Sequence, residues 1–439
     1  MRRAAAESRA EAMKYTTILF DLDGTLTRSE KGITRSALYA CEKMGFTGHN
    51  EEEFKVFIGP PLVESVQKVC GMTPEQAHHA IELYRERFSV LGWAENEVYT
   101  GIAPLMRSLK KNGCKIAITT AKPQAFAEKI AEKFGFAPYL DALIGPGMDN
   151  THASKTWIVK KAIEQLGGVP VMIGDRCYDV DGGKENGIDT IGVCYGYGTR
   201  EELEAAGATH IAETVEELSD ILLGDAPRAR GIFITMEGVD GCGKTTQRNA
   251  LIAHLEQLGW EVQLTREPGG DEIAEKIRTL ILDPVNTAMD DLTEAYLYAA
   301  SRAQNVRAKI WPALDSGKAV VCDRFVDSSI AYQGGGRQLG TQKIQEINRF
   351  AIENAVPDIT VYLRMPPEVA LSRRLSASEP DRLEREKASF FERTFDAYEA
   401  LYAQKGMERV VAVDASRGIE EVSQEMIAAV DRKLRALKA

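Results

Sequence analysis

The chain has 439 residues, of which 44% are hydrophobic and 27% charged, a composition typical of folded globular proteins that excludes a fibrous or disordered chain. At roughly 100 to 200 residues per domain, this length predicts two or three domains. The net charge of -11 argues against a broad nucleic-acid-binding surface. Seven cysteines without a CxxC pair favour a reducing compartment, and no apolar run reaches the roughly 18 to 20 residues that span a bilayer. We therefore expect a cytoplasmic protein that binds neither nucleic acid nor membranes.

The first thirteen residues are predicted to be an N-terminal extension. The segment is basic and rich in alanine, and it lacks the apolar region and cleavage site of a secretory signal. Strand-like sequence begins only at Tyr15. Met13 is an alternative start, in which case the preceding residues are an upstream extension.

Short β-rich runs alternate with longer helical patterns, which predicts βαβ units and mainly parallel sheets. The expected strands are 16–20, 115–120, 171–174 and 190–193, followed by 232–236, 261–265, 319–322, 359–363 and 410–413. A polar stretch that contains proline, residues 224–230, interrupts both periodicities. We predict an α/β protein with two doubly wound parallel-sheet domains, residues 14–223 and 231–439, joined by this linker.

One segment, residues 28–93, breaks the alternation because its pattern is helical and contains no convincing strand. It is therefore expected to be a helical insertion after the first strand. Such an insertion would cover the C-terminal edge of the sheet, where open α/β folds bind ligands.

Polar side chains stand at the ends of three expected strands and just before one expected helix in the first domain. A pair of carboxylates spaced i, i+2 is often only a solvated turn, but here two further acids, a hydroxyl and a lysine are expected at the same sheet edge. A carboxylate can attack phosphorus when a hard cation offsets the repulsion, and clustered acids suit Mg²⁺. This pattern indicates phosphoryl transfer. The candidates are Asp21, Asp23, Thr120, Lys155, Asp175 and Asp179.

These residues resemble the four motifs of the haloacid-dehalogenase superfamily, in its phosphoglycolate-phosphatase-like branch. The resemblance covers roughly residues 14–223 and implies a Rossmann-like core with a helical cap at about 28–93. It also implies hydrolysis of a phosphomonoester through a phosphoaspartate. In this resemblance the nucleophile is Asp21 and the general acid/base is Asp23. The phosphoryl oxygens would be held by Thr120 and Lys155, and Mg²⁺ would be bound by Asp21, Asp23, Asp175 and Asp179.

The substrate of such a phosphatase depends on its cap. Residues 57–62 resemble the cap loop of phosphoglycolate- and nucleotide-directed members. Phosphoglycolate and a 5′-nucleotide both remain candidates.

The second domain opens with a full GxxxxGKT pattern between an expected strand and an expected helix. In a P-loop of this type, glycine N–H groups surround phosphates, the lysine contacts the β and γ groups, and the threonine holds Mg²⁺. The pattern predicts binding of a nucleoside triphosphate. Its residues are Gly238, Val239, Asp240, Gly241, Cys242, Gly243, Lys244 and Thr245.

Further polar residues follow the next strands of this domain. Tyr298 and Arg302 are spaced i, i+4, so on a helix they share one face, where an aromatic ring and a guanidinium could bind a base. Taken alone, a tyrosine such as Tyr298 more often belongs to a hydrophobic core than to a stacking platform. The polar residues at or after these strand ends are Glu267, Arg324, Ser328, Ser329 and Gln333.

Together these segments resemble bacterial thymidylate kinases over essentially all of residues 231–439. The resemblance implies ATP-dependent phosphorylation of dTMP to dTDP, with Lys244 and Arg324 catalytic, Arg278 and Arg324 on the monophosphate, and a homodimer. Tyr298 takes the stacking place where phenylalanine is usual. In this resemblance Asp240 and Glu267 would lie near the deoxyribose and the acceptor, and Pro268 would also bind substrate. The thymine edge would be bound by Arg302, Ser328, Ser329 and Gln333.

Some positions depart from that family. Asp271 stands where a small or neutral residue usually follows TREPGG, and Leu375 and Ala377 stand where bacterial members often have arginine. Cys242 also leaves the P-loop without an arginine. The lid is expected around residues 373–384. Arg373, Arg374 or Arg382 is expected to take the place of the missing arginines. Two alternatives remain: a kinase with a non-catalytic regulatory phosphatase-like domain, and a broader nucleoside monophosphate kinase.

Overall fold

A computed structural model of the protein describes residues 13–58, 62–148, 151–352, 354–375, 382–383 and 385–437. The chain divides into two compact units, one mainly formed by the residues up to Ala229 and the other mainly from Arg230 onward. Most of the predicted N-terminal extension, residues 1–12, lies outside the described residues, whereas Met13 is buried in the core of the first unit.

The first unit contains a six-stranded sheet in the order β5-β4-β1-β6-β7-β8, with every pair of neighbours parallel. Thr17 of the central strand lies opposite Lys115 on one side and Pro170 on the other. The strands are β1 (Thr17–Phe20), β4 (Lys115–Thr119), β5 (Ala142–Ile144), β6 (Pro170–Gly174), β7 (Asp189–Val193) and β8 (His210–Ala212).

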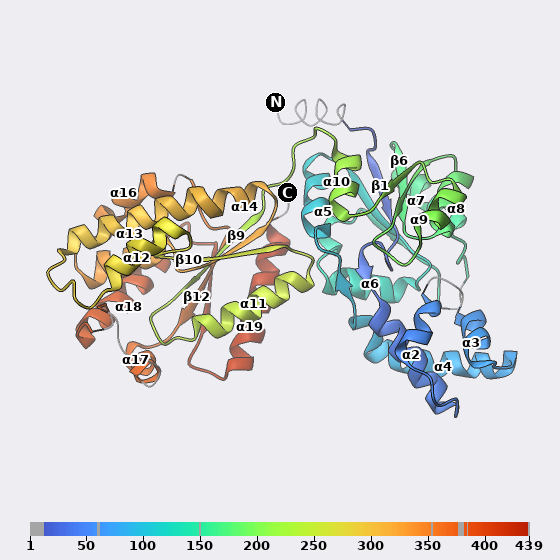
Figure 1. The fold of residues 1–439 in the computed structure, drawn as a ribbon, viewed down its shortest axis with the longest axis horizontal. Helices are drawn as coiled ribbons and strands as arrows, with labels where there is room; N and C mark the ends of the chain where they lie inside the picture. The colour runs from blue at the N-terminus through green and yellow to red at the C-terminus, as the bar shows by residue number, and fades with distance from the viewer. Residues whose placement is uncertain are drawn as a thin grey trace. The chain divides into compact units, whose positions relative to one another are not determined.

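Helices cover both faces of this sheet because alternate residues of each strand point to opposite sides. Ile18 packs in a core with α5 and α10, whereas its neighbour Leu19 packs with α7. Figure 1 shows α5 and α10 on one side of β1 and α7 to α9 on the other. The helices are α5 (Ile102–Lys111), α6 (Gln124–Lys133), α7 (Lys155–Leu166), α8 (Cys177–Glu185), α9 (Arg200–Ala206) and α10 (Val215–Leu223).

The predicted helical insertion is present and has its own hydrophobic core, which includes Phe54, Tyr84 and Phe88. The prediction that residues 28–93 contain no strand was wrong at one end. Arg28 pairs with Glu97 in a short antiparallel ladder, at the place where the chain leaves and re-enters the core. The elements are β2 (Thr27–Arg28), α2 (Glu30–Lys43), η1 (Glu51–Phe57), α3 (Leu62–Cys70), α4 (Pro74–Val90), η2 (Gly92–Ala94) and β3 (Glu97–Val98).

The second unit contains a five-stranded sheet in the order β10-β11-β9-β12-β13, again entirely parallel. Phe233 of the central strand packs with η4 and α14, and α19 contacts β12 and β13. Figure 1 shows α13 and α14 on one side of this sheet and α11 and α19 on the other. The strands are β9 (Ile232–Glu237), β10 (Val262–Arg266), β11 (Ala319–Asp323), β12 (Ile359–Arg364) and β13 (Val410–Asp414).

Eleven helical segments complete the described part of this unit. Two of them, η4 and η5, are π-helical. They are α11 (Lys244–Gln257), α12 (Glu272–Leu282), α13 (Asp291–Asn305), η4 (Val306–Ile310), α14 (Trp311–Asp315), α15 (Val326–Ser329), η5 (Ile330–Gly336), α16 (Thr341–Ile352), α17 (Pro367–Leu375), α18 (Ala388–Tyr402) and α19 (Ile419–Ala436).

The predicted fold class is confirmed, and all nine expected strands are present within one or two residues of their predicted ends. The prediction missed the two edge strands of the first sheet, β5 and β8. Each has three residues and is only partly buried, so neither forms the continuous apolar run that marks a central parallel strand. Among the described residues, no helix is both long and apolar enough to cross a membrane.

Candidate active sites

The first candidate site lies at the carboxyl ends of three neighbouring strands. Asp21 follows β1, Thr120 follows β4 and Asp175 follows β6. Parallel strands bring these ends to one edge of the sheet. Lys155 is the first residue of α7 and Asp179 lies in the first turn of α8, so both helices begin at the same edge.

Three of the predicted metal-binding acids form a buried cluster. Asp21, Asp175 and Asp179 each place one carboxylate oxygen within 4.8 Å of the others. Burial raises the pKa of Asp21 to about 7, although Lys155 opposes the shift, and burial raises that of Asp175 well above its usual value. Asp175 Oδ1 is buried without a hydrogen-bond partner among the described residues. An all-oxygen set of this kind fits a hard divalent cation such as Mg²⁺.

Lys155 supplies positive charge inside this cluster. Its Nζ lies 2.6 Å from Asp21 Oδ1 and 2.7 Å from Asp179 Oδ1, and it donates to the Thr119 carbonyl at 3.0 Å. Burial lowers the pKa of the ammonium, but the two carboxylates outweigh that effect and raise it. Lys155 therefore joins Asp21 to Asp179 through two ion pairs.

Asp23 has a different environment from the three clustered acids. Its Oδ2 lies 3.0 Å from Nζ of Lys122, a residue that the sequence prediction did not assign. Lys122 Nζ also lies 4.7 Å from the centre of the Phe88 ring on α4 of the insertion. The hydroxyl of Thr120, which is buried, accepts a hydrogen bond from the Lys122 backbone N–H at 3.1 Å. The sheet edge and the insertion therefore meet at Lys122, next to Asp23.

Two glycines allow the acids to approach so closely. Gly24 has a φ of 86°, and a Cβ there would lie 2.2 Å from Asp175 Oδ2. A Cβ on Gly174 would lie 2.1 Å from Asp179 Cγ. A side chain at either position would displace one of the clustered carboxylates.

The predicted cap loop, residues 57–62, is described only in part, because Gly59 to Pro61 lie outside the described residues. Ile58 is buried, and its carbonyl accepts a hydrogen bond from Arg176 Nη1 at 3.0 Å. Arg176 follows Asp175 directly and also pairs with Glu202 at 2.9 Å. The cap loop is thus joined to the residue beside the acid cluster.

The second candidate site begins with the P-loop between β9 and α11. Gly238 and Gly243 have φ values of 140° and 90°, which other residues rarely adopt. Lys244 Nζ donates to the Gly238 and Val239 carbonyls at 3.0 and 2.9 Å, and Thr245 next to it is exposed. The loop leads directly into the N-terminus of α11, where N–H groups and the helix dipole favour anions.

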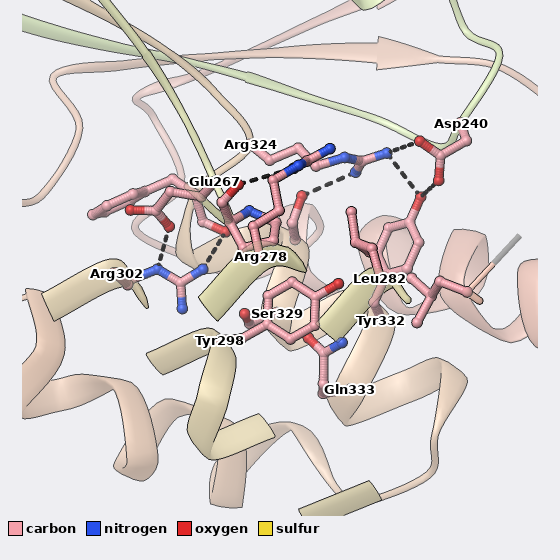
Figure 2. A pocket seen from close by; sticks show the side chains of 14 residues that line it. Asp240, Glu267, Arg278, Leu282, Tyr298, Arg302, Arg324, Ser329, Tyr332 and Gln333 are labelled. Carbon is pink, nitrogen blue, oxygen red and sulfur yellow. Dashed lines mark hydrogen bonds and ion pairs between the residues drawn. The ribbon is translucent and has the colours of Figure 1, made fainter. Parts of the chain in front are cut away.

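A pocket adjoins this loop (Figure 2), and all ten predicted substrate-binding residues line it. The prediction missed four further residues of its wall. The lining is Asp240, Glu267, Pro268, Arg278, Leu282, Tyr298, Arg302, Arg324, Phe325, Ser328, Ser329, Tyr332, Gln333 and Leu383.

Arg324 connects the P-loop to the pocket wall. Its guanidinium donates to the Gly238 carbonyl and the Tyr332 hydroxyl, each at 3.0 Å, and pairs with Asp240. The Tyr332 hydroxyl donates to the other oxygen of Asp240 at 2.8 Å. Burial would raise the pKa of Asp240, but the charges of Arg324 and Lys244 hold it well below its usual value. Arg324 also has a φ of 68°, a strained conformation that is often retained at functional sites.

Arg302 forms a buried wall of the pocket. Its Nε lies 2.6 Å from Glu267 Oε2, Nη2 donates to the Phe325 carbonyl at 3.1 Å, and Nη1 donates to Asn348. Figure 2 shows the contacts that join Arg302 to Glu267 and Arg324 to Asp240. Burial raises the pKa of Glu267, although Arg302 opposes the shift.

A second buried carboxylate, Glu294 of α13, organises the far wall. Its Oε1 accepts from Gln333 Nε2 at 2.9 Å, and its Oε2 accepts from Arg337 at 3.0 Å and from Arg382 at 2.5 Å. Since Gln333 Nε2 is bound to Glu294, the orientation of the Gln333 amide is fixed. Arg382, a predicted lid substitute, is therefore paired with a carboxylate behind the pocket wall.

The two predicted serines differ in their hydrogen bonds. Ser328 donates to Glu237 Oε2 at 2.6 Å and accepts from Arg324 Nη1 at 3.1 Å. Burial, assisted by the charge of Asp327, raises the pKa of Glu237 to about 7. Ser329 Oγ is buried and has no hydrogen-bond partner in the described part of the chain. Ser329 is thus a donor and acceptor that a ligand in the pocket could satisfy.

One departure from the family pattern, the acid at Asp271, has a local explanation. Asp271 is the N-cap of α12, where its side chain accepts from the N–H groups of Ile273 and Ala274, both at 3.1 Å. These two hydrogen bonds account for an acid at that position.

Most of the predicted lid, residues 376–381 and 384, lies outside the described residues, as do the side chains of 374 and 375. Arg373 donates to the carbonyls of Ala415 and Ser416 at 3.3 and 3.2 Å.

Comparison with known proteins gives one family for each unit. Residues 236–426 match the family model described as thymidylate kinase, and residues 18–193 match the one described as haloacid dehalogenase-like hydrolase. The thymidylate kinase of Pediococcus pentosaceus is 47% identical over 207 residues, which are 46% of this chain and 99% of that protein. That of Latilactobacillus sakei subsp. sakei is 48% identical over 195 residues, 44% of this chain and 91% of that protein.

Two solved structures are similar to the first unit. A predicted phosphatase from Clostridium acetobutylicum has 41% sequence identity and a TM-score of 0.45, covering 47% of this chain and 97% of that chain. A haloacid dehalogenase-like family hydrolase from Streptococcus pneumoniae has 26% identity and a TM-score of 0.44, covering 46% of this chain and 96% of that chain.

The acid cluster predicts a divalent-cation site that depends on Asp175. We expect Asp175→Asn to weaken binding of Mn²⁺, used as a probe for Mg²⁺, by at least about tenfold in the absence of nucleotide, because a charged oxygen ligand is lost. Titration calorimetry or electron paramagnetic resonance measures this affinity. The control is Asp181→Asn, an exposed acid on α8, the helix that begins two residues after Asp175. Equal weakening in both variants would contradict the prediction.

Proposed function

Because the chain belongs to the thymidylate kinase family and also carries a haloacid dehalogenase-like hydrolase domain, we propose that it is a bifunctional enzyme that phosphorylates dTMP and hydrolyses a phosphomonoester. The kinase transfers the γ-phosphoryl group of ATP to dTMP, giving dTDP and ADP. The pocket beside the P-loop is the observation that carries this assignment, since Asp240 belongs to both and Arg324 contacts both.

At the phosphate end of the kinase site, the chain offers cations and backbone N–H groups. Lys244 and the glycine-rich loop would hold the ATP phosphates, and Arg278 and Arg324 would hold the monophosphate of dTMP. The pairing of Arg324 with Asp240 and Tyr332 sets its direction before the substrate binds. Catalysis then follows from positioning the two phosphates in line and stabilising the charge on the transferred group.

At the base end, Tyr298 would stack on thymine, and Arg302, Ser328, Ser329 and Gln333 would bind its polar edge. The buried hydroxyl of Ser329, which has no partner among the described residues, supports a polar ligand at this place. The bond from Gln333 to Glu294 supports a fixed hydrogen-bonding pattern, which discriminates between bases more strongly than a mobile amide. Glu267 and Pro268 complete the wall near the sugar.

In the phosphatase, the Asp21 carboxylate would attack the phosphorus atom and the ester oxygen would leave with a proton from Asp23. Asp23 would then take a proton from the water that hydrolyses the phosphoaspartate. Lys155 is a fixed cation 2.6 Å from Asp21, which supports its role on the phosphoryl oxygens with Thr120. Phosphoglycolate and a 5′-nucleotide both remain candidate substrates, and the cap would select between them.

Both reactions are proposed to use Mg²⁺. In the phosphatase, Asp21, Asp23, Asp175 and Asp179 would hold it, and in the kinase Thr245 would do so. When bound, Mg²⁺ supplies positive charge that reduces the repulsion between the phosphate and the groups that approach it.

We also propose a homodimer that acts in the cytoplasm. Apolar side chains on α12 and α13 are unusually exposed, with Leu280 47% and Tyr296 57% accessible, which supports an interface on these helices. The seven cysteines are all free thiols, which supports a reducing compartment.

The substrate assignments predict two separate product patterns. With ATP, we expect ADP release to be much faster with dTMP than with dUMP, dCMP, dAMP or dGMP. Without ATP, we expect phosphate release from phosphoglycolate or from one nucleoside monophosphate. A coupled ADP assay and a phosphate assay on the same panel measure both. Equal ADP release with all monophosphates would indicate the broader kinase, and no phosphate release would indicate a regulatory phosphatase-like domain.

Asp21→Asn should separate the two activities. Because the carboxylate nucleophile is lost, phosphate release should fall by at least about a thousandfold, while kinase turnover with dTMP stays within about twofold of the parent. Asp181→Asn is the matched control and should leave both activities unchanged. Loss of kinase turnover in Asp21→Asn would show that the two units do not work independently.

Glu294 is predicted to position the base-binding wall. Glu294→Gln should raise the KM for dTMP by about tenfold or more, because Gln333 loses its charged acceptor and two arginines lose their buried partner, while the KM for ATP changes less than about twofold. Steady-state kinetics with each substrate varied measures this difference. Glu346→Gln, an exposed acid on α16, is the control. A parallel rise of both KM values would contradict the positioning role.

A further inference from the structure

Two thiols of the helical insertion lie in contact. Cys41 is on α2 and Cys70 is the last residue of α3, and their Sγ atoms are 3.0 Å apart although 29 residues separate them in the chain. A disulfide bond is about 2.05 Å long, so an approach of about 1 Å would join them. Both residues belong to or border the core of the insertion, which fixes the helices that carry them.

The two thiols differ in their access to solvent. Cys41 is completely buried, whereas Cys70 is partly exposed at the end of its helix. A small oxidant can therefore reach Cys70, and Cys41 is placed to react with the oxidised sulfur. Burial raises the pKa of both thiols, which keeps the thiolate fraction low and the first step slow.

The other cysteines have partners of a different kind. Cys114 contacts Met13 Sδ and the Tyr15 carbonyl at 3.9 and 3.8 Å, and Cys322 donates to the Arg324 carbonyl at 3.0 Å. Cys194 lies in the first unit, as Cys41 and Cys70 do; it is partly exposed and has no role in the proposed catalytic sites. The contact between Cys41 and Cys70 is therefore a specific feature of the insertion and not a consequence of a thiol-rich region.

We propose that Cys41 and Cys70 are a redox site that forms a reversible disulfide on exposure to a peroxide. The Cys70 thiol loses its proton, and the thiolate attacks one oxygen of hydrogen peroxide. The O–O bond breaks, a sulfenic acid forms, and the released hydroxide takes up the proton that the thiol lost, giving water. The Cys41 sulfur then displaces the sulfenic oxygen, which leaves as a second water. Two thiols are oxidised to one disulfide and one peroxide is reduced to two waters. A dithiol reductant reverses the change.

The bond would cross-link α2 to α3. Ile58, which Arg176 contacts beside the acid cluster, packs in the same core. The disulfide would thus restrict the insertion that borders the phosphatase site, while the kinase unit contains neither cysteine. We expect the oxidised protein to resist proteolysis in residues 30–90 more strongly than the reduced protein and to keep its kinase turnover.

The test uses the full chain, treated with hydrogen peroxide, alkylated and digested without reduction. Mass spectrometry should find one cross-linked peptide pair, Cys41 with Cys70, lighter by two hydrogens than the sum of the two peptides and lost after dithiothreitol. Cys194→Ser should give the same pair in the same yield. Cys41→Ser should give no pair and should leave Cys70 as a sulfenic acid that dimedone traps.

Two results would overturn the proposal. One is recovery of Cys70 as an alkylated thiol or as a sulfinic acid, with no cross-link to Cys41. The other is cross-linking of Cys70 to Cys177 or Cys194 in similar yield, which would show unspecific oxidation. Both results come from the unsubstituted protein, so they hold even if Cys41→Ser fails to fold.

Discussion

Charges that are buried at the carboxyl ends of parallel strands have to be compensated within the protein, and both sites are built around this requirement. In the first unit, Asp21, Asp175 and Asp179 lie within 4.8 Å of one another, and Lys155 pairs with Asp21 and Asp179. Burial, together with the neighbouring carboxylates, raises the pKa values of Asp21 and Asp175, and Lys155 only partly opposes the shift of Asp21. An all-oxygen cluster of this kind fits a hard divalent cation. This unfavourable arrangement is what makes the site suitable for a metal-assisted reaction on an anionic substrate.

In the second unit, buried charges are compensated by ion pairs between side chains. Arg324 is paired with Asp240, Arg302 with Glu267, and Glu294 with two arginines, so most charges in the pocket wall are balanced before a ligand binds. Such pairs hold the side chains in one direction, which suits a reaction that depends on the alignment of two phosphates. The cost is that each pair depends on both partners. Loss of one member leaves an uncompensated buried charge, and the wall around it has to rearrange.

Most of the candidate residues could be predicted because each follows a recognisable strand or belongs to a loop of fixed spacing. Asp21 and Asp175 follow β1 and β6, and the P-loop lies between β9 and α11. Lys122, Tyr332 and Leu383 were missed. A lysine three residues after a strand, a tyrosine in a helical segment and a leucine are common residues that give no signal of function by themselves. Lys122 becomes a candidate site residue only through its ion pair with Asp23, and Tyr332 only through its hydrogen bond to Asp240.

The sequence by itself determined the chemistry and the order of elements, because apolar periodicity and glycine-rich turns act over a few residues. It placed acids at strand ends in one half of the chain and a phosphate-binding loop in the other. Only the tertiary structure decided which charges share a partner, as in the bond from Gln333 to Glu294, and which thiols touch, as in Cys41 and Cys70. These contacts join residues 29 or more positions apart. They depend on how whole helices pack, and no local pattern in the chain records that packing.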